Sequence, residues 1–237
     1  MTTSDLPRAV VGAACLAPWG ERARDVPGAA PVDLTSVPGF VTSRFNPLVA
    51  AVAEQCLGAP GGDLIHGLGE RTAIVLATAC GDTTTSDLAT RKLVAGQVHS
   101  PLLFFQSVTT SILGHLARQY GITGPVSCVS ACEDLAGSAL RLADLLLFDD
   151  ELEQVLVIGV ELAPNDRVTW VRDRLGAEHP LGRLPLGEDA AVALLLRRAT
   201  RGRPAVPADP PHPAYGWLGQ LVGLCTAAAH PDTSTTD

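Results

Sequence analysis

The 237-residue chain is long enough for one sizeable domain, and 46% of its residues are apolar although aromatic residues make up only 4%. Its formal net charge is −8, from 25 acidic and 17 basic residues, and the sequence has no basic stripe, which argues against a general nucleic-acid binder. No apolar run reaches the roughly 20 residues of a membrane helix, and charged residues from Glu21 to Asp25 interrupt the first one, so we expect a cytoplasmic protein without a signal peptide or a membrane partner.

Short apolar runs alternate with helical patterns along the first third of the chain. Residues 9–16 are predicted to form a buried strand. A helix is expected next, with Asn46 as its cap, Pro47 at its first position and Gly58 as its end. Residues 72–78 are predicted to form a second buried strand.

The middle of the chain continues this alternation. Asp82 is expected to cap a helix, and residues 107–120 are predicted to form another helix that Gly121 ends. Residues 126–129 are predicted to form a short strand. Residues 133–148 have apolar side chains on nearly every side, which indicates a helix buried on more than one face.

The last third predicts two more strands and a change in composition. The strands are expected over residues 154–160 and 190–196. Strands that alternate with helices indicate an α/β fold with a mainly parallel sheet. We expect one folded domain over residues 1–200, followed over residues 201–237 by a Pro-rich linker and C-terminal tail, in which residues 217–228 are predicted to form a short helix.

The candidate site lies where the strand of residues 126–129 turns into the next helix. Ser130, Ala131 and Cys132 form a tight turn, which is typical of a nucleophile elbow that presents one side chain at a helix N-terminus. Unpaired amides and the helix dipole there lower a thiol pKa and stabilise an oxyanion. Because a cysteine can accept an acyl group from a thioester, Cys132 is the candidate catalytic residue.

Several motifs resemble those of the β-ketoacyl synthases, which have a thiolase-like fold. Gly159-Val160-Glu161 is similar to their Gly-Gly-x-Glu strand end, and residues 186–191 are similar to their Leu-Gly-Glu-Gly-Ala-Ala strand. The resemblance covers residues 8–198. The run that leads to the active cysteine of the family is matched in order by Ser100-Pro101, Gly114-His115-Leu116, Tyr120-Gly121, Gly124-Pro125 and Ala131-Cys132.

The sequence also departs from the family. No residues after Arg198 match the second half of that fold, which supplies two His and a Lys, so the chain is expected to hold only the N-terminal half. Glu133 and Asp134 follow Cys132, and two carboxylates beside a thiol raise its pKa. They also resemble the Ala-Gly-Glu-Asp signature of chain-length-factor-type proteins, in which Gly replaces the cysteine. Both acids are equally suited to complement the helix dipole.

The resemblance implies a role for residues before the elbow. The family dimerises through this region, and Val108 sits at a position that lines the partner's acyl channel, with Gln106, Thr109 and Thr110 close by. It implies a chain-length-factor-like subunit that pairs with a full-length ketosynthase in polyketide, polyene or fatty-acid chain elongation, and that shapes the acyl tunnel. An acyl carrier protein is the implied substrate carrier, and the arginines available to bind it are Arg118, Arg167, Arg172 and Arg174.

Other interpretations stay open. Cys132 is either a small buried side chain left from an ancestral nucleophile or a thiol that carries an acyl group. In the second case the chain is a stand-alone acyltransferase or thioesterase, with His115 or the Glu133-Asp134 pair as base. A third possibility is a homodimeric binding protein that holds an acyl chain without reacting. His115 is expected to be structural. The six cysteines form no Cys-x-x-Cys pair beside histidines, so we expect no metal, and the resemblance implies no cofactor.

Overall fold

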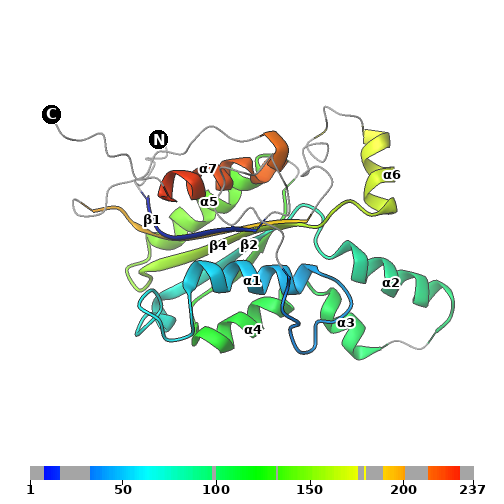
Figure 1. Cartoon of the computed structure of the whole chain (residues 1–237), viewed down its shortest axis with the longest axis horizontal. Coiled ribbons are helices and arrows are strands. Elements are labelled where there is room, and N and C mark those ends of the chain that lie inside the picture. Colours follow the sequence, from blue (N-terminus) through cyan, green and yellow to red (C-terminus); the bar gives the residue numbers. More distant parts are fainter. Residues whose placement is uncertain are drawn as a thin grey trace.

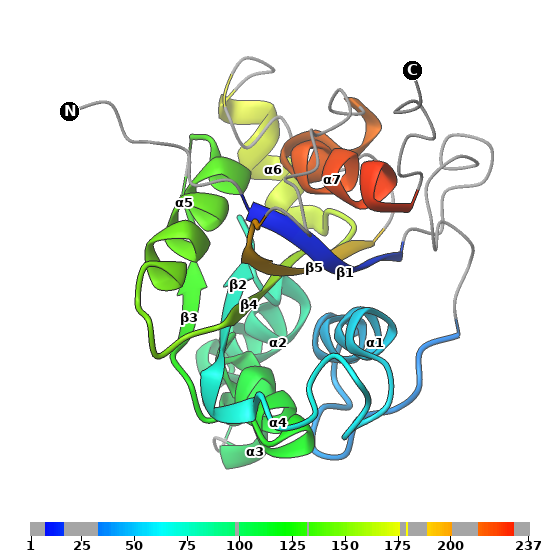
Figure 2. The same cartoon turned by 90° about the vertical axis from the view of Figure 1, so that its left-hand side faces the viewer.

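Five strands form one sheet at the centre of the molecule. The computed structural model describes residues 8–16, 33–97, 100–131, 133–175, 179, 189–200 and 213–229. Within these residues the strand order is β1-β5-β4-β2-β3, and helices cover both faces of the sheet (Figures 1 and 2). The strands are β1 (Arg8–Leu16), β2 (Thr72–Ala77), β3 (Val126–Val129), β4 (Gln154–Glu161) and β5 (Ala190–Arg198).

The sheet is mixed, as expected. β3, β2 and β4 pair in parallel, whereas β5 pairs antiparallel with both β4 and β1. Four of these strands therefore run in one direction and β5 alone runs in the other. All five lie where the apolar runs predicted them, with boundaries that differ by one or two residues. The prediction of an α/β fold with a mainly parallel sheet is confirmed.

Two helical layers enclose the sheet. α1 and α4 pack on one face and α5 and α7 on the other (Figure 1). Neighbouring strand residues alternate between the two apolar clusters: Ile74 faces α1 and α4, and Val75 faces α5. The helices are α1 (Phe45–Leu57), α2 (Thr83–Val94), α3 (Pro101–Ser107), α4 (Ser111–Tyr120), α5 (Leu135–Leu147), α6 (Asp166–Leu175) and α7 (Gly219–Ala229), with short 3-10 helices η2 (Gly69–Arg71) and η4 (Pro213–Leu218).

Helix α5 is less completely buried than its composition predicted. Its inner face, which includes Leu140, Ala143 and Leu147, packs into the cluster on the sheet. Leu145 and Phe148 are 65% and 61% exposed, because they lie on the outer side of the same helix. Helix α5 thus packs on the sheet and beside η4 and α7, whereas its outer side stays open to solvent.

The C-terminal segment belongs to the packed core. Tyr215, Leu218, Leu221 and Cys225 are fully buried, and they join the same apolar cluster as α5. The short helix expected over residues 217–228 is confirmed as η4 and α7. The expected boundary at residue 200 stays a prediction for the linker, since residues 201–212 lie outside the described part, but residues 213–229 are not a detached tail.

Two expected helix boundaries are wrong. α1 begins at Phe45 rather than after Asn46, because Ser43 Oγ accepts the Phe45 amide and the Asn46 side chain instead donates to the Gln106 carbonyl at 3.3 Å. The helix predicted over residues 107–120 begins only at Ser111, as α4, because the chain is extended at Val108, where the separate helix α3 has just ended at Ser107. Three β-branched or hydroxylated residues in a row, Val108 to Thr110, disfavour a continuous helix there.

Asp82 and Gly121 act as expected. The Asp82 side chain accepts the Thr85 amide at 3.0 Å and caps α2. Gly121 ends α4 in a left-handed conformation with φ 65°. Gly124 is needed for a different reason, because a Cβ at this position would lie 2.2 Å from the Thr72 carbonyl oxygen. These contacts fix the path from α4 into β3.

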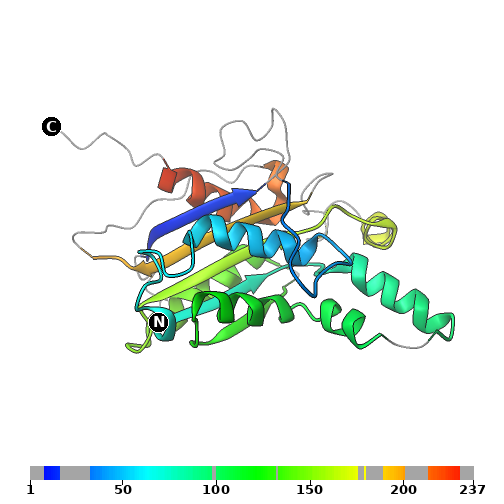
Figure 3. The ribbon, with the colours of Figure 1, turned by 60° about the horizontal axis from the view of Figure 1, so that its bottom comes forward.

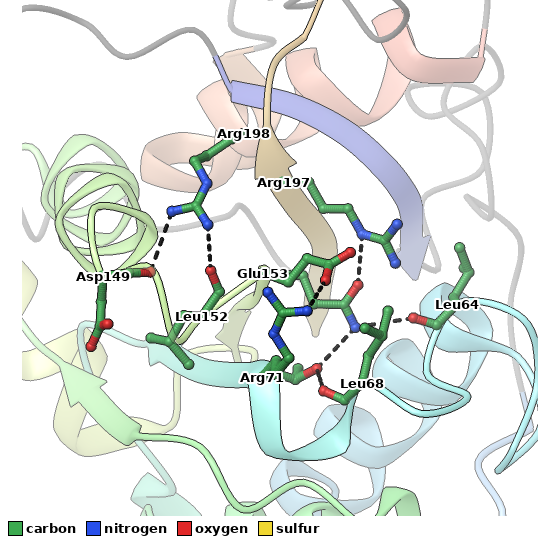
Figure 4. A network of polar contacts seen from close by, with 10 residues as sticks. Leu64, Leu68, Arg71, Asp149, Leu152, Glu153, Arg197 and Arg198 are labelled. Carbon is green, nitrogen blue, oxygen red and sulfur yellow. Dashed lines mark hydrogen bonds and ion pairs between the residues drawn. The ribbon is translucent and has the colours of Figure 1, made fainter.

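A polar network lies at the edge of the sheet where the strands β2 and β4 begin (Figure 4). The buried Gln154 donates to the Leu64 carbonyl and to Thr72 Oγ1, and it accepts Arg197 Nε at 2.9 Å. Arg71 pairs with Glu153 at 2.8 Å across the same edge (Figure 4). These side chains satisfy one another, so this edge is structural. The chemistry-bearing residues lie at the opposite edge.

Candidate functional site

The candidate site lies where the parallel strands β2, β3 and β4 end. Their carboxyl ends meet at one edge of the sheet, as parallel pairing requires. The β2 loop starts at Thr78, the β3 turn at Ser130 and the β4 loop after Glu161. β5 begins at the same edge, because Ala190 pairs with Glu161. Four segments that are far apart in sequence therefore converge here.

The predicted elbow has the expected strand–turn–helix order. β3 ends at Val129 and α5 begins at Leu135, and the turn between them is short. Cys132, the candidate nucleophile, lies outside the described residues. The side chains of its neighbour Glu133 and of Asp134 are exposed.

Asp134 has a structural task in this turn. It takes a left-handed conformation with φ 44°, and its carboxylate accepts the Gly137 amide at 3.1 Å. Arg141 pairs with the same carboxylate at 2.8 Å one turn further along α5. Asp134 is thus the N-cap of α5, which agrees with the interpretation of this acid as a complement to the helix dipole.

The side chain of Glu161 is almost fully buried at this edge. It is 1% exposed, and one of its oxygens, Oε1, accepts the Ala79 amide, Thr78 Oγ1 at 3.3 Å and Trp217 Nε1 at 3.1 Å. Its other oxygen, Oε2, has no hydrogen-bond partner. Burial raises the pKa of Glu161 to about 7, and the donated hydrogen bonds offset only part of that desolvation.

Cys80 is a second thiol at the site edge. It is half-buried in the β2 loop, and its backbone amide donates to the Glu161 carboxyl. Desolvation, and to a lesser extent the charge of Glu161, raise the pKa of Cys80 to about 12. A thiol held neutral in this way is a poor nucleophile at physiological pH, so Cys80 does not replace Cys132 as a candidate.

The β2 loop is tied to the β3 turn. The Thr78 amide donates to the Val129 carbonyl at 3.2 Å, so the strand pairing continues one residue past β2. Ser130 Oγ donates to the Ala79 carbonyl at 3.4 Å. Thr78 and Ala79 both donate to the buried carboxyl of Glu161. The carboxyl is therefore connected through these two residues to Val129 and Ser130, which lead into the elbow.

The four predicted tunnel residues differ in exposure, and Thr109 is the one with a contact to this loop in the described residues. Gln106 is buried, and its Oε1 accepts the Val41 and Thr42 amides at 2.8 and 2.9 Å, so its side chain is used inside the chain. Thr109 Oγ1 lies 3.3 Å from the place that a Cβ on Gly81 would take. Val108 and Thr110 are exposed, as residues that face a partner or a tunnel must be.

Asp189, which stands where the family motif has Gly, also contributes at this edge. Its carboxylate accepts the Ala163 amide at 2.9 Å and pairs with Arg44 at 3.3 Å. It therefore holds the loop after β4 against the residue that precedes α1. The sequence showed the substitution but gave no sign of these two partners.

The other candidate residues do not join the site. His115 lies on α4, which covers the sheet face opposite to α5, and its ring lies 6.3 Å from that of Phe40. Within the described residues, no group of three or more His, Cys, Asp or Glu side chains could hold a metal ion. No helix in the described ranges is long and apolar enough to cross a membrane.

Comparison with known proteins rests on structure alone. No family model matches this chain, and no curated protein matches its sequence. A chain of the complex of a ketosynthase (ApeO) with its chain length factor (ApeC) from Xenorhabdus doucetiae superposes with a TM-score of 0.66 at 20% identity, over 94% of this chain and 92% of that one. The thiolase-like fold of the ketosynthases is shared. This is a ketosynthase-type fold.

Two further structures have the same ketosynthase-type fold. The ishigamide ketosynthase/chain length factor matches with a TM-score of 0.63 at 19% identity, over 84% of this chain and 64% of that one. A type II polyketide acyl carrier protein in complex with its ketosynthase matches with a TM-score of 0.60 at 16% identity, over 81% and 58%. The chain thus spans about three fifths of these two longer chains and most of the Xenorhabdus one. The fold expected from the motifs is confirmed.

Two functional candidates were missed by sequence reasoning. Glu161 was recognised as part of a motif, but nothing in the sequence indicated that its carboxyl would be buried with one free oxygen. Trp217 was assigned to a short helix of no function, although it reaches Glu161 across 56 residues of sequence. The signals that the sequence offered were an acidic residue at the end of an apolar strand and a tryptophan next to a Pro-rich region.

Proposed function

We propose that this chain is a chain-length-factor-like subunit that pairs with a full-length β-ketoacyl–acyl carrier protein synthase and shapes the acyl tunnel of the complex. The pathway class is polyketide, polyene or fatty-acid-type chain elongation. In this proposal the partner performs the condensation on chains carried by an acyl carrier protein, and the chain described here is non-catalytic alone. The observation that carries the proposal is an exposed apolar surface that runs into Val108.

That surface lies on a projecting pair of helices, which we call the α2–α3 arm (residues 88–97 and 100–108). α2 and α3 project from one end of the molecule (Figures 1 and 3). The charged residues of the arm are Arg91 and Lys92 alone. Large exposed apolar side chains are uncommon in such density on a monomer and are typical of subunit interfaces. Those of the arm are Leu93, Val94, Leu102, Phe104, Phe105 and Val108.

An open sheet edge supports the same proposal. β3 is the last strand in the order, and no strand of the described residues pairs with its outer side. Val126 and Cys128 are exposed on it, and β3 contains neither a charged residue nor a proline to block pairing. An unprotected edge of this kind is suited to pair with a strand of a second subunit.

The arginines and cysteines bear on the carrier protein and on location. Arg118 is exposed on α4, whereas Arg167 is engaged with Asp87 at 2.7 Å. Arg174 lies 3.7 Å from the centre of the Trp170 ring. Arg118 and Arg174 are therefore the better candidates for binding an acidic acyl carrier protein.

We propose a cytoplasmic location, because the five cysteines of the described part are all free thiols.

The alternative, a stand-alone acyltransferase or thioesterase that uses Cys132, has less support. Such an enzyme needs a base beside the thiol. His115 is on the wrong side of the sheet, and Asp134 is occupied by its cap and by Arg141. Glu133 is the base that the described residues leave for this mechanism.

The experiment is product analysis of the complex co-expressed with its full-length ketosynthase and supplied with extender-loaded acyl carrier protein. Val108→Phe is expected to shorten the products, because a larger side chain blocks the tunnel that this residue is proposed to line. Leu175→Phe, on the exposed end of α6, is the matched control and leaves the products unchanged.

Cys132→Ala separates the two candidate functions in the same assay. A non-catalytic subunit keeps its products and its rate after this change, since the partner holds the acyl chain. Loss of all turnover after Cys132→Ala, together with unchanged products after Val108→Phe, would overturn the proposal in favour of the acyltransferase.

A further inference from the structure

The C-terminal segment reaches the candidate site through one side chain. Trp217 lies in η4, just before α7, on the same face of the sheet as α5 (Figure 1). Its indole Nε1 donates to Glu161 Oε1 at 3.1 Å. The neighbouring residues Tyr215 and Leu218 are fully buried, so the backbone that carries the indole is held on both sides.

η4 packs tightly against β4. A Cβ on Gly159, two residues before Glu161, would lie 2.6 Å from Leu218 and 3.2 Å from the Trp217 ring. The indole is therefore set against β4 by packing as well as by its hydrogen bond. This placement requires Gly at position 159, and it aims the donor at the carboxyl oxygen.

Glu161 carries the contact on to the β2 loop. The same Oε1 accepts the Ala79 amide and Thr78 Oγ1, and the Cys80 amide also donates to the carboxyl. Thr78 Oγ1 in turn accepts the Gly81 amide at 2.9 Å. One buried oxygen thus holds Thr78 and Ala79 directly, and Thr78 Oγ1 passes the constraint on to Gly81.

The β2 loop then holds the turn that enters the elbow. The Thr78 amide donates to the Val129 carbonyl, and the Ala79 carbonyl accepts Ser130 Oγ. A continuous path of contacts runs from Trp217 through Glu161 and Ala79 to Ser130. It joins η4 to Ser130, two positions before Cys132.

We propose that Trp217 and Glu161 are positioning residues that fasten the C-terminal segment to the β2 loop and thereby fix the turn between β3 and α5. The segment of residues 213–229 is then an integral part of the candidate site. Neither residue touches a substrate in this proposal. It holds whichever function the site performs, because it concerns the backbone on which the site is built.

The test is amide hydrogen exchange on the full chain, followed by peptides from the β2 loop, the β3 turn and β1. Trp217→Phe removes the donor and keeps an aromatic ring. It is expected to speed exchange in the first two peptides about tenfold, the effect of losing one buried hydrogen bond, and to leave β1 unchanged. Trp170→Phe, the same change at an exposed tryptophan of α6, is the matched control and alters none of them.

Conservative and disruptive changes at Glu161 separate positioning from general stability. Glu161→Gln keeps an acceptor oxygen and is expected to preserve most of the protection, whereas Glu161→Leu removes it and matches Trp217→Phe. Equal exchange in Trp217→Phe and Trp170→Phe, or a uniform rise that includes β1, overturns the proposal. If Glu161→Leu does not fold, the comparison of amide hydrogen exchange between Trp217→Phe and Glu161→Gln still tests the proposal. Pairing with the ketosynthase is measured on the same samples, and a wild-type chain that does not pair, together with the expected rise in exchange in Trp217→Phe, would count against the proposed function only.

Discussion

At the residue scale, the protonation of Glu161 couples the site to pH. Burial holds the folded-state pKa at about 7, above the ordinary value of 4.5 that the unfolded chain has. Between these values the folded state keeps a proton that the unfolded state has lost, so the free energy of unfolding falls as pH rises. The stabilisation is complete below pH 4.5 and is lost as pH passes 7.

The prediction compares wild type with Glu161→Gln. The wild type is expected to lose ~1–3 kcal/mol of unfolding free energy between pH 4.5 and 7.5 relative to the variant, whose amide does not titrate. Urea unfolding at both pH values measures the difference. The Cys80 thiol titrates at about 12 and stays neutral in both proteins. Parallel pH profiles would mean that Glu161 is charged in the folded protein.

Gly159 gives a second prediction at this scale. Gly159→Ala is expected to cost about 1–3 kcal/mol, because the added methyl group has no space against Leu218 and Leu221. Gly114→Ala is the matched control, since nothing lies within 4 Å of a Cβ there and an alanine in α4 stabilises by up to about 1 kcal/mol. Denaturant midpoints of the two variants on opposite sides of wild type are the expected result. A neutral Gly159→Ala contradicts the close packing of η4 on β4.

Single residues also show what the sequence could reveal. Gly121 was predicted to end a helix, because a left-handed cap is a local property that only its neighbours decide. The roles of Asp189 and Trp217 could not be predicted, because their partners Ala163 and Glu161 lie at least 26 residues away in sequence. Contacts of that range are set by the fold and leave no periodic pattern.

At the element scale, the start of α5 depends on its cap. Asp134 is in a left-handed conformation, which Asn tolerates and Ala does not, and its side chain accepts the Gly137 amide. Asp134→Ala is expected to cost ~1 kcal/mol or more, whereas Asp134→Asn costs less than ~1 kcal/mol, because only the exposed pair with Arg141 is lost. Thermal unfolding of both variants measures this. Equal losses in the two variants would mean that the ion pair, and not the cap, holds the turn.

Strands were easier to predict than helix boundaries. Apolar runs identified all five strands. Each strand is either buried on both faces of the sheet or is the neighbour of a strand that is buried in this way. The break at Val108 was missed because the helical spacing of apolar residues continues across it, and the break depends on the contacts of Gln106 with Val41 and Thr42. α6 was not predicted, because only Val168 of its residues is buried and charged residues interrupt its apolar pattern.

At the scale of the whole molecule, the chain covers part of its own apolar surface and exposes the rest. η4 and α7 pack beside α5 on one face of the sheet, whereas Leu145 on the outer side of α5 remains exposed. The α2–α3 arm and the outer side of β3 remain uncovered within the described residues. The partner is therefore expected at the arm and at β3.

The arm gives a prediction about assembly. Phe104 is 71% exposed, so Phe104→Glu is expected to leave the unfolding free energy of the lone chain within about 0.5 kcal/mol. In the complex the same change places a carboxylate in an apolar interface and is expected to weaken pairing with the ketosynthase at least tenfold. Trp170→Glu on α6 is the control with unchanged pairing. Binding measured by interferometry that is equal for both variants would exclude the arm from the interface.

The central claim is that this chain is a subunit of a ketosynthase complex, and size-exclusion chromatography with light scattering tests it most directly. The chain is co-expressed with a full-length ketosynthase and compared with the chain alone. We expect a stable 1:1 complex, and a lone chain that self-associates through its exposed apolar arm. A monodisperse monomer that does not bind the ketosynthase would contradict the account and direct attention to acyl transfer at Cys132.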